Sequence, residues 1–213
     1  MAIIVKDTAQ KVNKYYSHIF FRMVELIKKT AIILTLFLLG ATTLSAQKLA
    51  VKSNLPYLAT ATPNIGVEVG LSEKFTLNVT YGLNPFIFKD NKRWNHWIVE
   101  PELRYWLCER FYGHFFGLHA GVGEYNINHV NIPFVKDSRN FRYEGFGVLA
   151  GLTYGHSWIL GGRWNMEAAL GAGIVYIEND KFDCSDCGRR LGENQKFFFA
   201  PTNVTLSIIY LIK

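Results

Sequence analysis

The chain has 213 residues, of which 23 are basic, 17 are acidic and 49% are hydrophobic. This length fits one domain plus a leader and excludes a large multidomain protein. The formal net charge of +6 does not indicate a nucleic-acid-binding protein, because residues 1–46 alone contribute +4 of it from six basic and two acidic residues.

The first recognisable element is an N-terminal leader. Lys28 and Lys29 supply positive charge, residues 31–39 form an apolar run, and small residues lead to Ala46, so cleavage is expected before Gln47. The run is too short to span a bilayer as a helix. We therefore predict a signal peptide in residues 1–46, with 1–22 interpreted as a mis-assigned start because Met23 gives a leader of ordinary length. A stable membrane anchor is the alternative.

Residues 47–213 are predicted to be one domain that consists almost entirely of β-strands, without a convincing amphipathic helix. Eight segments alternate apolar residues with small or polar ones, which is the period of a strand with two different faces. These segments are residues 49–55, 64–71, 75–83, 97–111, 114–125, 145–155, 164–176 and 203–212. Most have roughly the 9–11 residues that a tilted strand needs to cross a membrane.

The connections between these segments alternate strictly between short and long. The short ones are Ser72–Lys74, Cys108–Arg110 and Gly161–Arg163, and the long ones are residues 56–63, 85–95, 126–140 and 178–196. Short periplasmic turns, long external loops and an even strand count are typical of outer-membrane barrels. The predicted fold is an all-β, up-and-down, eight-stranded antiparallel transmembrane barrel in the outer membrane, with both chain ends periplasmic.

The segment WIVEPELRYWLCERF, residues 97–111, shows which face lies inside. An arginine facing lipid at mid-depth would cost about 2–4 kcal/mol, whereas in the lumen it can be paired with carboxylates. We therefore expect Trp97, Val99, Leu103 and Tyr105 to face lipid, with Trp97 and either Tyr105 or Trp106 near the two interfaces. Pro101 has no N–H group and should interrupt the ladder, through a bulge or a kink.

The alternation predicts seven ionisable side chains in the lumen, namely Lys52, Glu68, Glu100, Glu102, Arg104, His119 and Glu167. In one interpretation they form a salt-bridged, hydrogen-bonded plug in a barrel too narrow for flow. In the other, Glu100, Glu102 and His119 are acid/base or ligand groups. Because no motif supplies a nucleophile with its base, we predict a plug and no enzyme. A lipid-modifying enzyme and a narrow pore are the alternatives.

The three cysteines do not predict a metal site. Cys184 and Cys187 form a single C-x-x-C motif, which supplies only half of a zinc site. In an exported protein a disulfide between them is the favoured interpretation, with metal binding or free thiols as alternatives. Cys108 has no obvious partner. No cofactor and no metal are expected.

The run WxxxPELRYWxCERFxGHFxGLHxGxGxYN over residues 97–126 resembles a bacterial family filed as domain of unknown function 3575. The segments NLPY (54–57), TPNIGVEVGL (62–71), RYEGFG (142–147) and CxxCG (184–188) resemble the same family. The resemblance implies a small outer-membrane barrel protein of the Bacteroidota without an assigned activity. Some members are encoded near fimbrial genes, which implies fimbrial or other surface proteins as partners.

The predicted external loops are rich in aromatic and charged residues, including Phe86, Trp94, Lys136 and Arg190. Such loops could bind a surface partner or act as a scaffold, or they could form a solvated rim that contacts lipopolysaccharide phosphates. The expected partners are therefore outer-membrane lipid and lipopolysaccharide, the outer-membrane assembly machinery and surface proteins, and no nucleic acid.

Overall fold

The computed structural model describes residues 49–88, 92–128, 141–183, 188 and 190–212. The predicted leader lies outside these residues, and so do Cys184 and Cys187. The signal peptide, the domain boundary at residue 47 and the disulfide therefore stay predictions.

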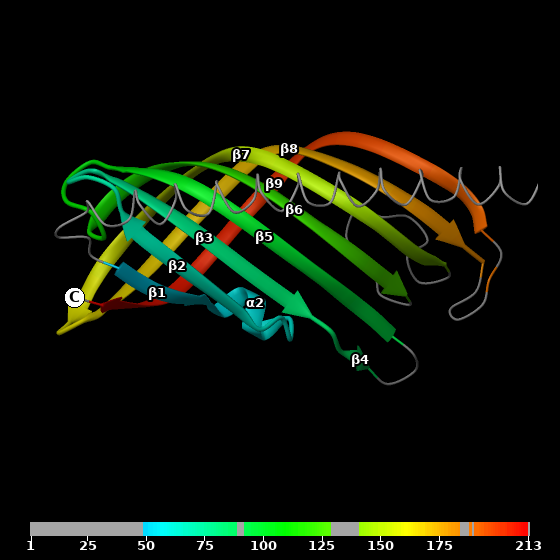
Figure 1. Ribbon diagram of the computed structural model, residues 1–213, viewed down its shortest axis with the longest axis horizontal. Helices are drawn as coiled ribbons and strands as arrows, with labels where there is room; N and C mark the ends of the chain where they lie inside the picture. The colour runs from blue at the N-terminus through cyan, green and yellow to red at the C-terminus, as the bar shows by residue number, and fades with distance from the viewer. Residues whose placement is uncertain (1–48, 89–91, 129–140, 184–187, 189, 213) are drawn as a thin grey trace, which may run out of the picture. The chain divides into compact units, whose positions relative to one another are not determined.

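The described residues form one antiparallel sheet that closes into a ring, as predicted (Figure 1). Consecutive strands are neighbours, and the ring closes where β1 pairs with β9 and β3 pairs with β5. The strands are β1 (Leu49–Asn54), β2 (Asn64–Gly70), β3 (Phe75–Asn84), β4 (Ile87–Phe88), β5 (Lys92–Trp106), β6 (Gly113–Asn128), β7 (Arg142–Gly161), β8 (Trp164–Phe182) and β9 (Arg190–Ile212). Because β4 has only two residues and extends the edge beside β5, the ring itself has eight strands.

The strands differ greatly in length, so the two ends of the ring differ. We call the end where Leu49 pairs with Ile212 the terminal end, and the opposite one the distal end. Strands β1 and β2 have 6 and 7 residues, whereas β7, β8 and β9 have 20, 19 and 23. The long strands therefore continue past the short ones at the distal end, as Figure 1 shows.

Three of the four predicted long links are shorter than expected. Strand β5 begins at Lys92, and β6 continues to Asn128. Strand β8 continues to Phe182, and β9 begins at Arg190. Thus residues 178–196 are mostly strand and not a long loop. Alternation disappears in these extensions because polar and apolar side chains no longer separate by face, as in the three successive phenylalanines of residues 197–199, while the backbone ladder continues.

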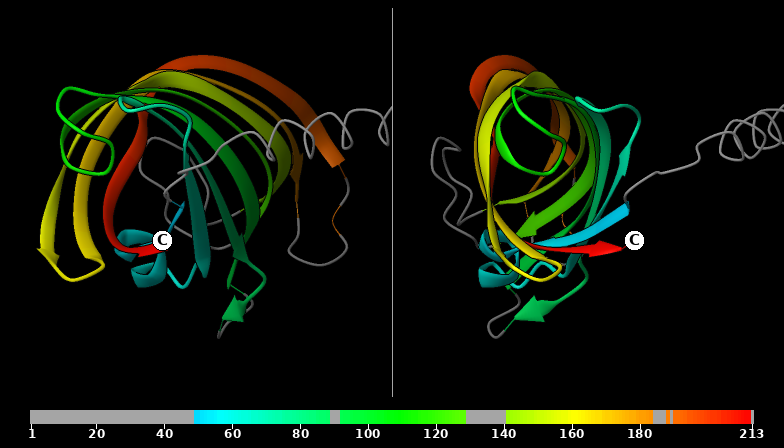
Figure 2. Two further views of the ribbon diagram at one scale, coloured as in Figure 1. Left: turned by 60° about the vertical axis from the view of Figure 1, so that its left-hand side comes forward. Right: turned by 90° about the vertical axis from the view of Figure 1, so that its left-hand side faces the viewer.

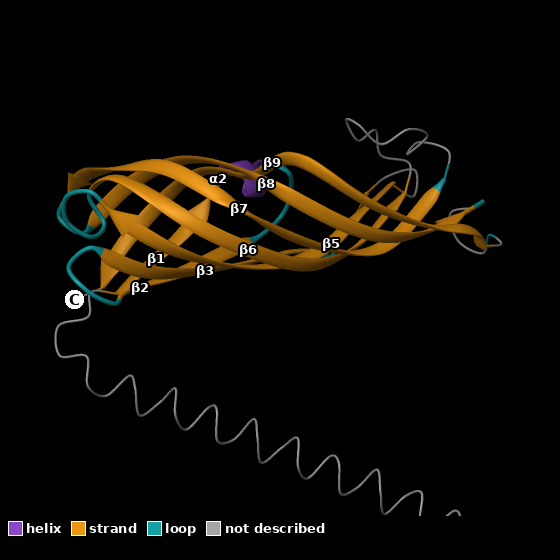
Figure 3. Ribbon diagram, turned by 90° about the horizontal axis from the view of Figure 1, so that it is seen from above, coloured by secondary structure: helices purple, strands orange, loops and turns teal. Residues whose placement is uncertain are grey.

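The remaining link, residues 56–63, contains a helix that the sequence did not predict. Helix α2 (Leu55–Ala59) begins where β1 ends and carries Pro56 in its first turn. Its five residues are too few to show helical periodicity. Figure 2 shows α2 beside the short strands, and in Figure 3 it is seen next to β9, which it contacts. The Tyr57 ring lies 3.4 Å from the position that a Cβ on Gly82 would take. Among the described residues, no helix has the length and apolar character needed to cross a bilayer.

The ring is polar inside and apolar outside. Among the described residues, 17 polar or charged side chains are buried, against six apolar ones. The opposite faces of the same strands expose large apolar side chains, including Leu103, Leu118, Leu152 and Leu170. This is the reverse of a soluble domain, whose strands bury the apolar face. Of the two residues proposed for an interface, Tyr105 lies outside, whereas Trp106 is fully buried inside.

Pro101 interrupts one ladder without shifting its register. Between β5 and β6, Val99 pairs with Val122 and Glu102 pairs with His119, and no pair forms between them. The pairing keeps the same register on both sides of this gap, so neither strand has an extra residue and there is no bulge. On the other side, Pro101 keeps its place opposite Val79 of β3. The predicted interruption is confirmed as a gap in hydrogen bonding.

Candidate functional site

The interior of the ring is organised around Arg104, near the end of β5. Its Nη1 lies 3.0 Å from an oxygen of Glu68 and 2.8 Å from one of Glu167, and its Nη2 lies 2.5 Å from Glu102. The side chain is 2% exposed. One guanidinium therefore binds three carboxylates that come from β2, β5 and β8, which suits its planar set of five donors.

Lys52 of β1 supplies the second cation. Its Nζ forms an ion pair with Glu68 and lies 3.4 Å from Glu167. Glu68 and Glu167 are both fully buried and are shared by Lys52 and Arg104. The network therefore ties the first strand of the ring to β2, β5 and β8. Separating one member would leave a buried charge without its partner, which is costly.

Uncharged side chains complete this network. Thr76 donates to Glu68 at 2.5 Å, and the indole Nε1 of Trp106 donates to Thr76 at 2.9 Å. The Arg104 guanidinium also lies 4.5 Å from the centre of the Phe115 ring, in cation–π geometry. The alternation within residues 75–83 puts Thr76 on the polar face, but it does not predict this contact. The inward direction of Trp106 could have been predicted, because it continues the even-numbered series of Glu100, Glu102 and Arg104.

Glycines make room for the bulky lumen side chains. A Cβ on Gly117 would lie 2.3 Å from Glu102 Oε1, and one on Gly155 would lie 2.4 Å from Phe115 Cζ. A Cβ on Gly66 would lie 2.6 Å from Lys52 Cγ. These distances are far below a normal van der Waals contact. The lumen is therefore filled by large side chains packed over glycines, which a narrow barrel requires.

His119 lies in a separate hydrogen-bonded group. Its Nδ1 is 2.8 Å from the Thr153 hydroxyl and its Nε2 is 2.8 Å from the Thr202 hydroxyl. A Cβ on Gly151 or Gly171 would lie 2.9 or 3.0 Å from the His119 Cε1 atom. Both ring nitrogens are thus engaged by neutral hydroxyls. The two threonines were not among the predicted site residues.

Glu100 is the predicted lumen residue that the network leaves out. It is 6% exposed, and its Oε1 has no hydrogen-bond partner among the described residues. Arg104 pairs with Glu102, Glu68 and Glu167 and not with Glu100. The structure therefore buries all seven predicted side chains. It joins five of them in ion pairs and places His119 and Glu100 outside that set.

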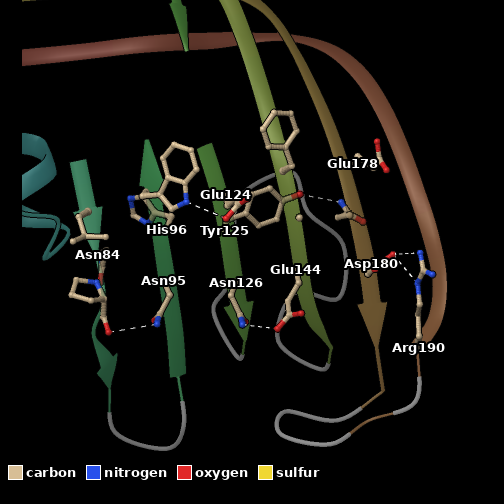
Figure 4. A pocket seen from close by; sticks show the side chains of 16 residues that line it. Asn84, Asn95, His96, Glu124, Tyr125, Asn126, Glu144, Glu178, Asp180 and Arg190 are labelled. Atoms are coloured by element: carbon tan, nitrogen blue, oxygen red, sulfur yellow. Dashed lines mark hydrogen bonds and ion pairs between the residues drawn. The ribbon is translucent and has the colours of Figure 1, made fainter. Parts of the chain in front are cut away.

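At the distal end, an open cavity of about 620 Å³ is lined by residues of β3, β5, β6, β7, β8 and β9 (Figure 4). Asn126 donates to Glu144 at 2.6 Å, and Asn179 donates to the Tyr125 hydroxyl at 3.2 Å. Arg190 forms an ion pair with Asp180 at 2.5 Å. Hydrogen bonding to Asp180, and then its negative charge, raise the pKa of Arg190 above its usual value.

The described residues contain no group of three or more histidine, cysteine, aspartate or glutamate side chains arranged to hold a metal ion. Cys108 is an exposed free thiol in the turn between β5 and β6. His156 and Ser157 are sequence neighbours on opposite faces of β7, and the Ser157 hydroxyl donates to the Phe111 carbonyl at 3.0 Å. That hydroxyl is therefore not paired with the histidine.

The model of a protein family described as "Protein of unknown function (DUF3575)" matches residues 32–212. The chain belongs to this family. The resemblance that the sequence motifs predicted is thereby confirmed. Neither the comparison with curated proteins nor the one with solved structures gives a significant match. Membership assigns no activity to a DUF3575 chain, so its function has to be argued from the ring and its interior.

Proposed function

We propose that this DUF3575 chain is a non-enzymatic outer-membrane barrel protein with a blocked lumen, whose distal end is a surface-exposed scaffold or binding module. The observation that carries the proposal is the inverted burial of the ring. Charged residues such as Arg104 and Glu68 are buried, while leucines on the opposite faces are exposed.

The exposed leucines form a continuous row across the wall. Leu103 of β5 pairs with Leu118 of β6, which pairs with Leu152 of β7. Their exposed fractions are 42%, 61% and 68%. Leaving each such side chain in water forgoes about 1.5–3 kcal/mol of burial free energy, and soluble monomers rarely expose apolar patches of this extent. Hydrocarbon around the ring removes this cost.

The outer face changes character toward both ends of the ring. Near the terminal end it carries aromatic side chains, and Trp164 packs on Tyr210 with ring centres 4.9 Å apart. Toward the distal end, Trp97 donates to Glu124 at 3.1 Å and Tyr176 donates to Glu178 at 3.2 Å. Aromatic girdles at the two interfaces are typical of transmembrane barrels. The short turns and the pairing of Leu49 with Ile212 at the terminal end favour a periplasmic position for that end.

The interior supports a plug over a pore or a catalytic site. Arg104 and Lys52 connect carboxylates from several walls of the ring, so long side chains cross the space that a solute would need. His119, the best candidate for a general base, is held between two threonine hydroxyls. General acid–base catalysis also needs the base to reach a substrate, and this imidazole is 1% exposed and has both nitrogens engaged.

The distal end supports a role in binding. Strands β5 to β9 continue beyond the short strands and carry polar side chains around the cavity of about 620 Å³. A rigid sheet that projects from a membrane can position recognition loops in a fixed arrangement. Outer-membrane lipid, lipopolysaccharide, fimbrial proteins and other surface proteins are the proposed partners. The outer-membrane assembly machinery is the proposed partner during insertion.

Membrane insertion and conductance test the first part of the proposal. We expect the protein to fractionate with the outer membrane and to show heat-modifiable migration on a gel, as folded barrels do. In planar bilayers we expect no steady conductance. Recovery as a soluble periplasmic monomer would contradict the membrane location, and a large steady current would contradict the plug.

Site-specific photo-crosslinking in intact cells tests the second part. We expect a probe at Glu193 of β9 to capture surface proteins or lipopolysaccharide, and a probe at Glu73, in the short turn at the terminal end, to capture neither. Both probes replace exposed glutamates, so the comparison isolates position. If the probe at Glu73 captured the same surface partners, the distal end would not be the binding region.

A further inference from the structure

One edge of β9 is unpaired at the distal end. Strand β1 occupies this edge from Ser207 to Ile212, and the side chain of Asn54 continues the contact to Val204. Helix α2, which follows β1 in the chain, also contacts β9. Residues 190–203 of β9 pair with β8 and with no other described strand. The free edge therefore continues the line that β1 occupies, and an added strand would extend that line.

A bulge in β9 decides which backbone groups face the free edge. The N–H of Leu206 and the carbonyl of Val204 bond to β1, so even-numbered residues face that side in this part of the strand. The pairing with β8 shifts by one residue at Thr202. Beyond the bulge, as far as residue 192, the odd-numbered residues therefore face the free edge. Pro201 fits this assignment, because it has no N–H group to leave unpaired there.

The backbone groups at the free edge belong to residues with exposed side chains, namely Glu193, Gln195, Phe197 and Phe199. The two phenylalanines are 74% and 76% exposed, the highest values of any large apolar side chain among the described residues. A row of unpaired N–H and C=O groups beside exposed apolar side chains is a template for pairing with another strand.

The outer face beside this edge changes from acidic to apolar along β9. Glu193 lies opposite Asp180 of β8, and both carboxylates bind the single cation Arg190, which leaves an excess of negative charge. Phe197 and Phe199 lie opposite an aromatic and an aliphatic residue of β8. An added strand would therefore fit best with a basic residue opposite Glu193 and apolar residues opposite the phenylalanines.

We propose that the free edge of β9 binds an extended segment of another surface protein as an added strand, with alternating apolar residues followed by a basic one. The inference rests on the proposed function, because it says how the distal end binds its partner. Lipopolysaccharide can contact the phenylalanines, but its sugars and phosphates do not repeat donors and acceptors at the spacing of a strand. A second copy in the same membrane would present this edge with the opposite tilt, so the two edges would cross instead of pairing along their length.

Amide hydrogen exchange of the detergent-folded full chain tests whether the edge is free. We expect the amides of Gln195, Phe197 and Phe199 to exchange at least tenfold faster than those of Lys196 and Phe198, which face β8. Equal protection of the two sets would mean that another part of the chain covers the edge, and it would overturn the proposal.

A synthetic peptide serves as the probe for the partner. In it threonine alternates with valine, valine, threonine and lysine, the order that antiparallel pairing with residues 193–199 requires. We expect this peptide to slow exchange at Gln195, Phe197 and Phe199 at least tenfold, in a saturable way. The same peptide with both valine nitrogens methylated keeps its side chains but loses N–H groups that face β9, so it should bind at least tenfold more weakly. Absence of slowing, or equal binding of the two peptides, would overturn the proposal.

Two kinds of variant locate the pairing on β9. Gln195→Pro removes an N–H group that faces the free edge and should weaken peptide binding at least tenfold, whereas Gln195→Ala keeps that group and should bind as wild type. Glu193→Lys should weaken binding of the lysine peptide and favour a peptide with glutamate in its place. Heat-modifiable migration verifies that each variant is folded. Wild-type binding by folded Gln195→Pro, or an unchanged peptide preference in Glu193→Lys, would contradict pairing at this edge.

Photo-crosslinking from Glu193 in cells separates this inference from the proposed function. If the probe captures surface proteins while the peptide and its methylated form bind equally, the distal end binds its partner through side chains, and the added strand alone is refuted. If the probe captures nothing and the peptide does not bind, the proposed binding role fails as well.

Discussion

The two halves of the ring hold their strands together by different means. In the terminal half every strand has two neighbours, and Arg104 and Lys52 join the strands across a buried interior. In the distal half β9 continues past β1. There, residues 190–203 of β9 pair only with β8 among the described residues. Polar side chains such as Arg190 and Asp180 make their contacts there in water.

The transition between the halves lies at Asn54, the last residue of β1. Its side-chain amide donates to the Val204 carbonyl at 3.1 Å and accepts from the Leu206 N–H at 3.1 Å. The Asn54 side chain thus makes two further hydrogen bonds to the backbone of β9, beyond the last backbone pairing of β1. The comparison teaches that the closed half depends on buried charge and close packing, whereas the distal half depends on its backbone ladder.

The largest expected effect is that of Arg104→Leu. The change leaves Glu68, Glu102 and Glu167 without their shared cation, and breaking such a buried pair costs about 3–5 kcal/mol. Urea unfolding in lipid vesicles measures the loss. Adding Glu167→Gln should restore part of it, because one of the unpaired charges is removed.

Arg190→Leu is the corresponding change in the distal half, since Arg190 likewise binds more than one carboxylate, those of Asp180 and Glu193. Its side chain is 53% exposed, so the pairs are screened by water and the midpoint should not change measurably. An equal loss for Arg104→Leu and Arg190→Leu would remove the distinction between the two halves.

The second effect concerns the outer wall. Leu152→Arg places a charge in the middle of the leucine row and should cost about 2–4 kcal/mol in a bilayer. Phe197→Arg lies on the distal part of β9 and should cost at most about 1 kcal/mol, as expected near an interface. Folding into vesicles measures both. A harmless Leu152→Arg would mean that water, and not lipid, surrounds the wall.

The third effect tests the packing of the closed half. Gly155→Ala places a Cβ 2.4 Å from Phe115 and 2.7 Å from the Ala169 Cβ, and such overpacking costs about 1–3 kcal/mol. Gly192→Ala in the distal half meets nothing within 4 Å and should be neutral. Unfolding midpoints of the two variants check this. Tolerance of Gly155→Ala would indicate a lumen with free space.

The smallest effect is expected at Asn54. Asn54→Ala leaves the Val204 carbonyl and the Leu206 N–H without partners, and we expect a loss of about 1–2 kcal/mol. Amide hydrogen exchange should accelerate at Leu206 and stay slow at residues of β8. Asn54→Asp retains the acceptor and should protect the Leu206 amide. If Leu206 exchanged equally in all three proteins, Asn54 would not hold the end of the closed half.

The sequence was a better guide to the closed half because alternation requires a contrast between two environments. Segments 49–55 and 75–83 match β1 and β3 closely for this reason. In the extensions of β8 and β9 each face carries both polar and apolar residues, so the pattern is lost although the ladder continues. Helix α2 has too few residues to show a helical period.

The buried faces of the lumen residues were also predictable, but their partners were not. Arg104 reaches Glu68 and Glu167, which lie 36 and 63 residues away in the sequence. Which carboxylates meet it depends on the stagger of the strands around the ring, and alternation carries no information about stagger. The contact of Arg104 with Glu102 follows from the local spacing of two residues, whereas the isolation of Glu100 depends on the whole ring.

The central claim is that lipid surrounds the wall of the ring and polar groups fill its interior. Spin labels attached through Leu152→Cys or Thr153→Cys, in a cysteine-free background in lipid vesicles, test it most directly, because these neighbours lie on opposite faces of β7. At position 152 the account predicts much faster relaxation by oxygen, which concentrates in lipid, than by a water-soluble nickel complex. At position 153 both effects should be small. Relaxation at position 152 dominated by the nickel complex would contradict the account.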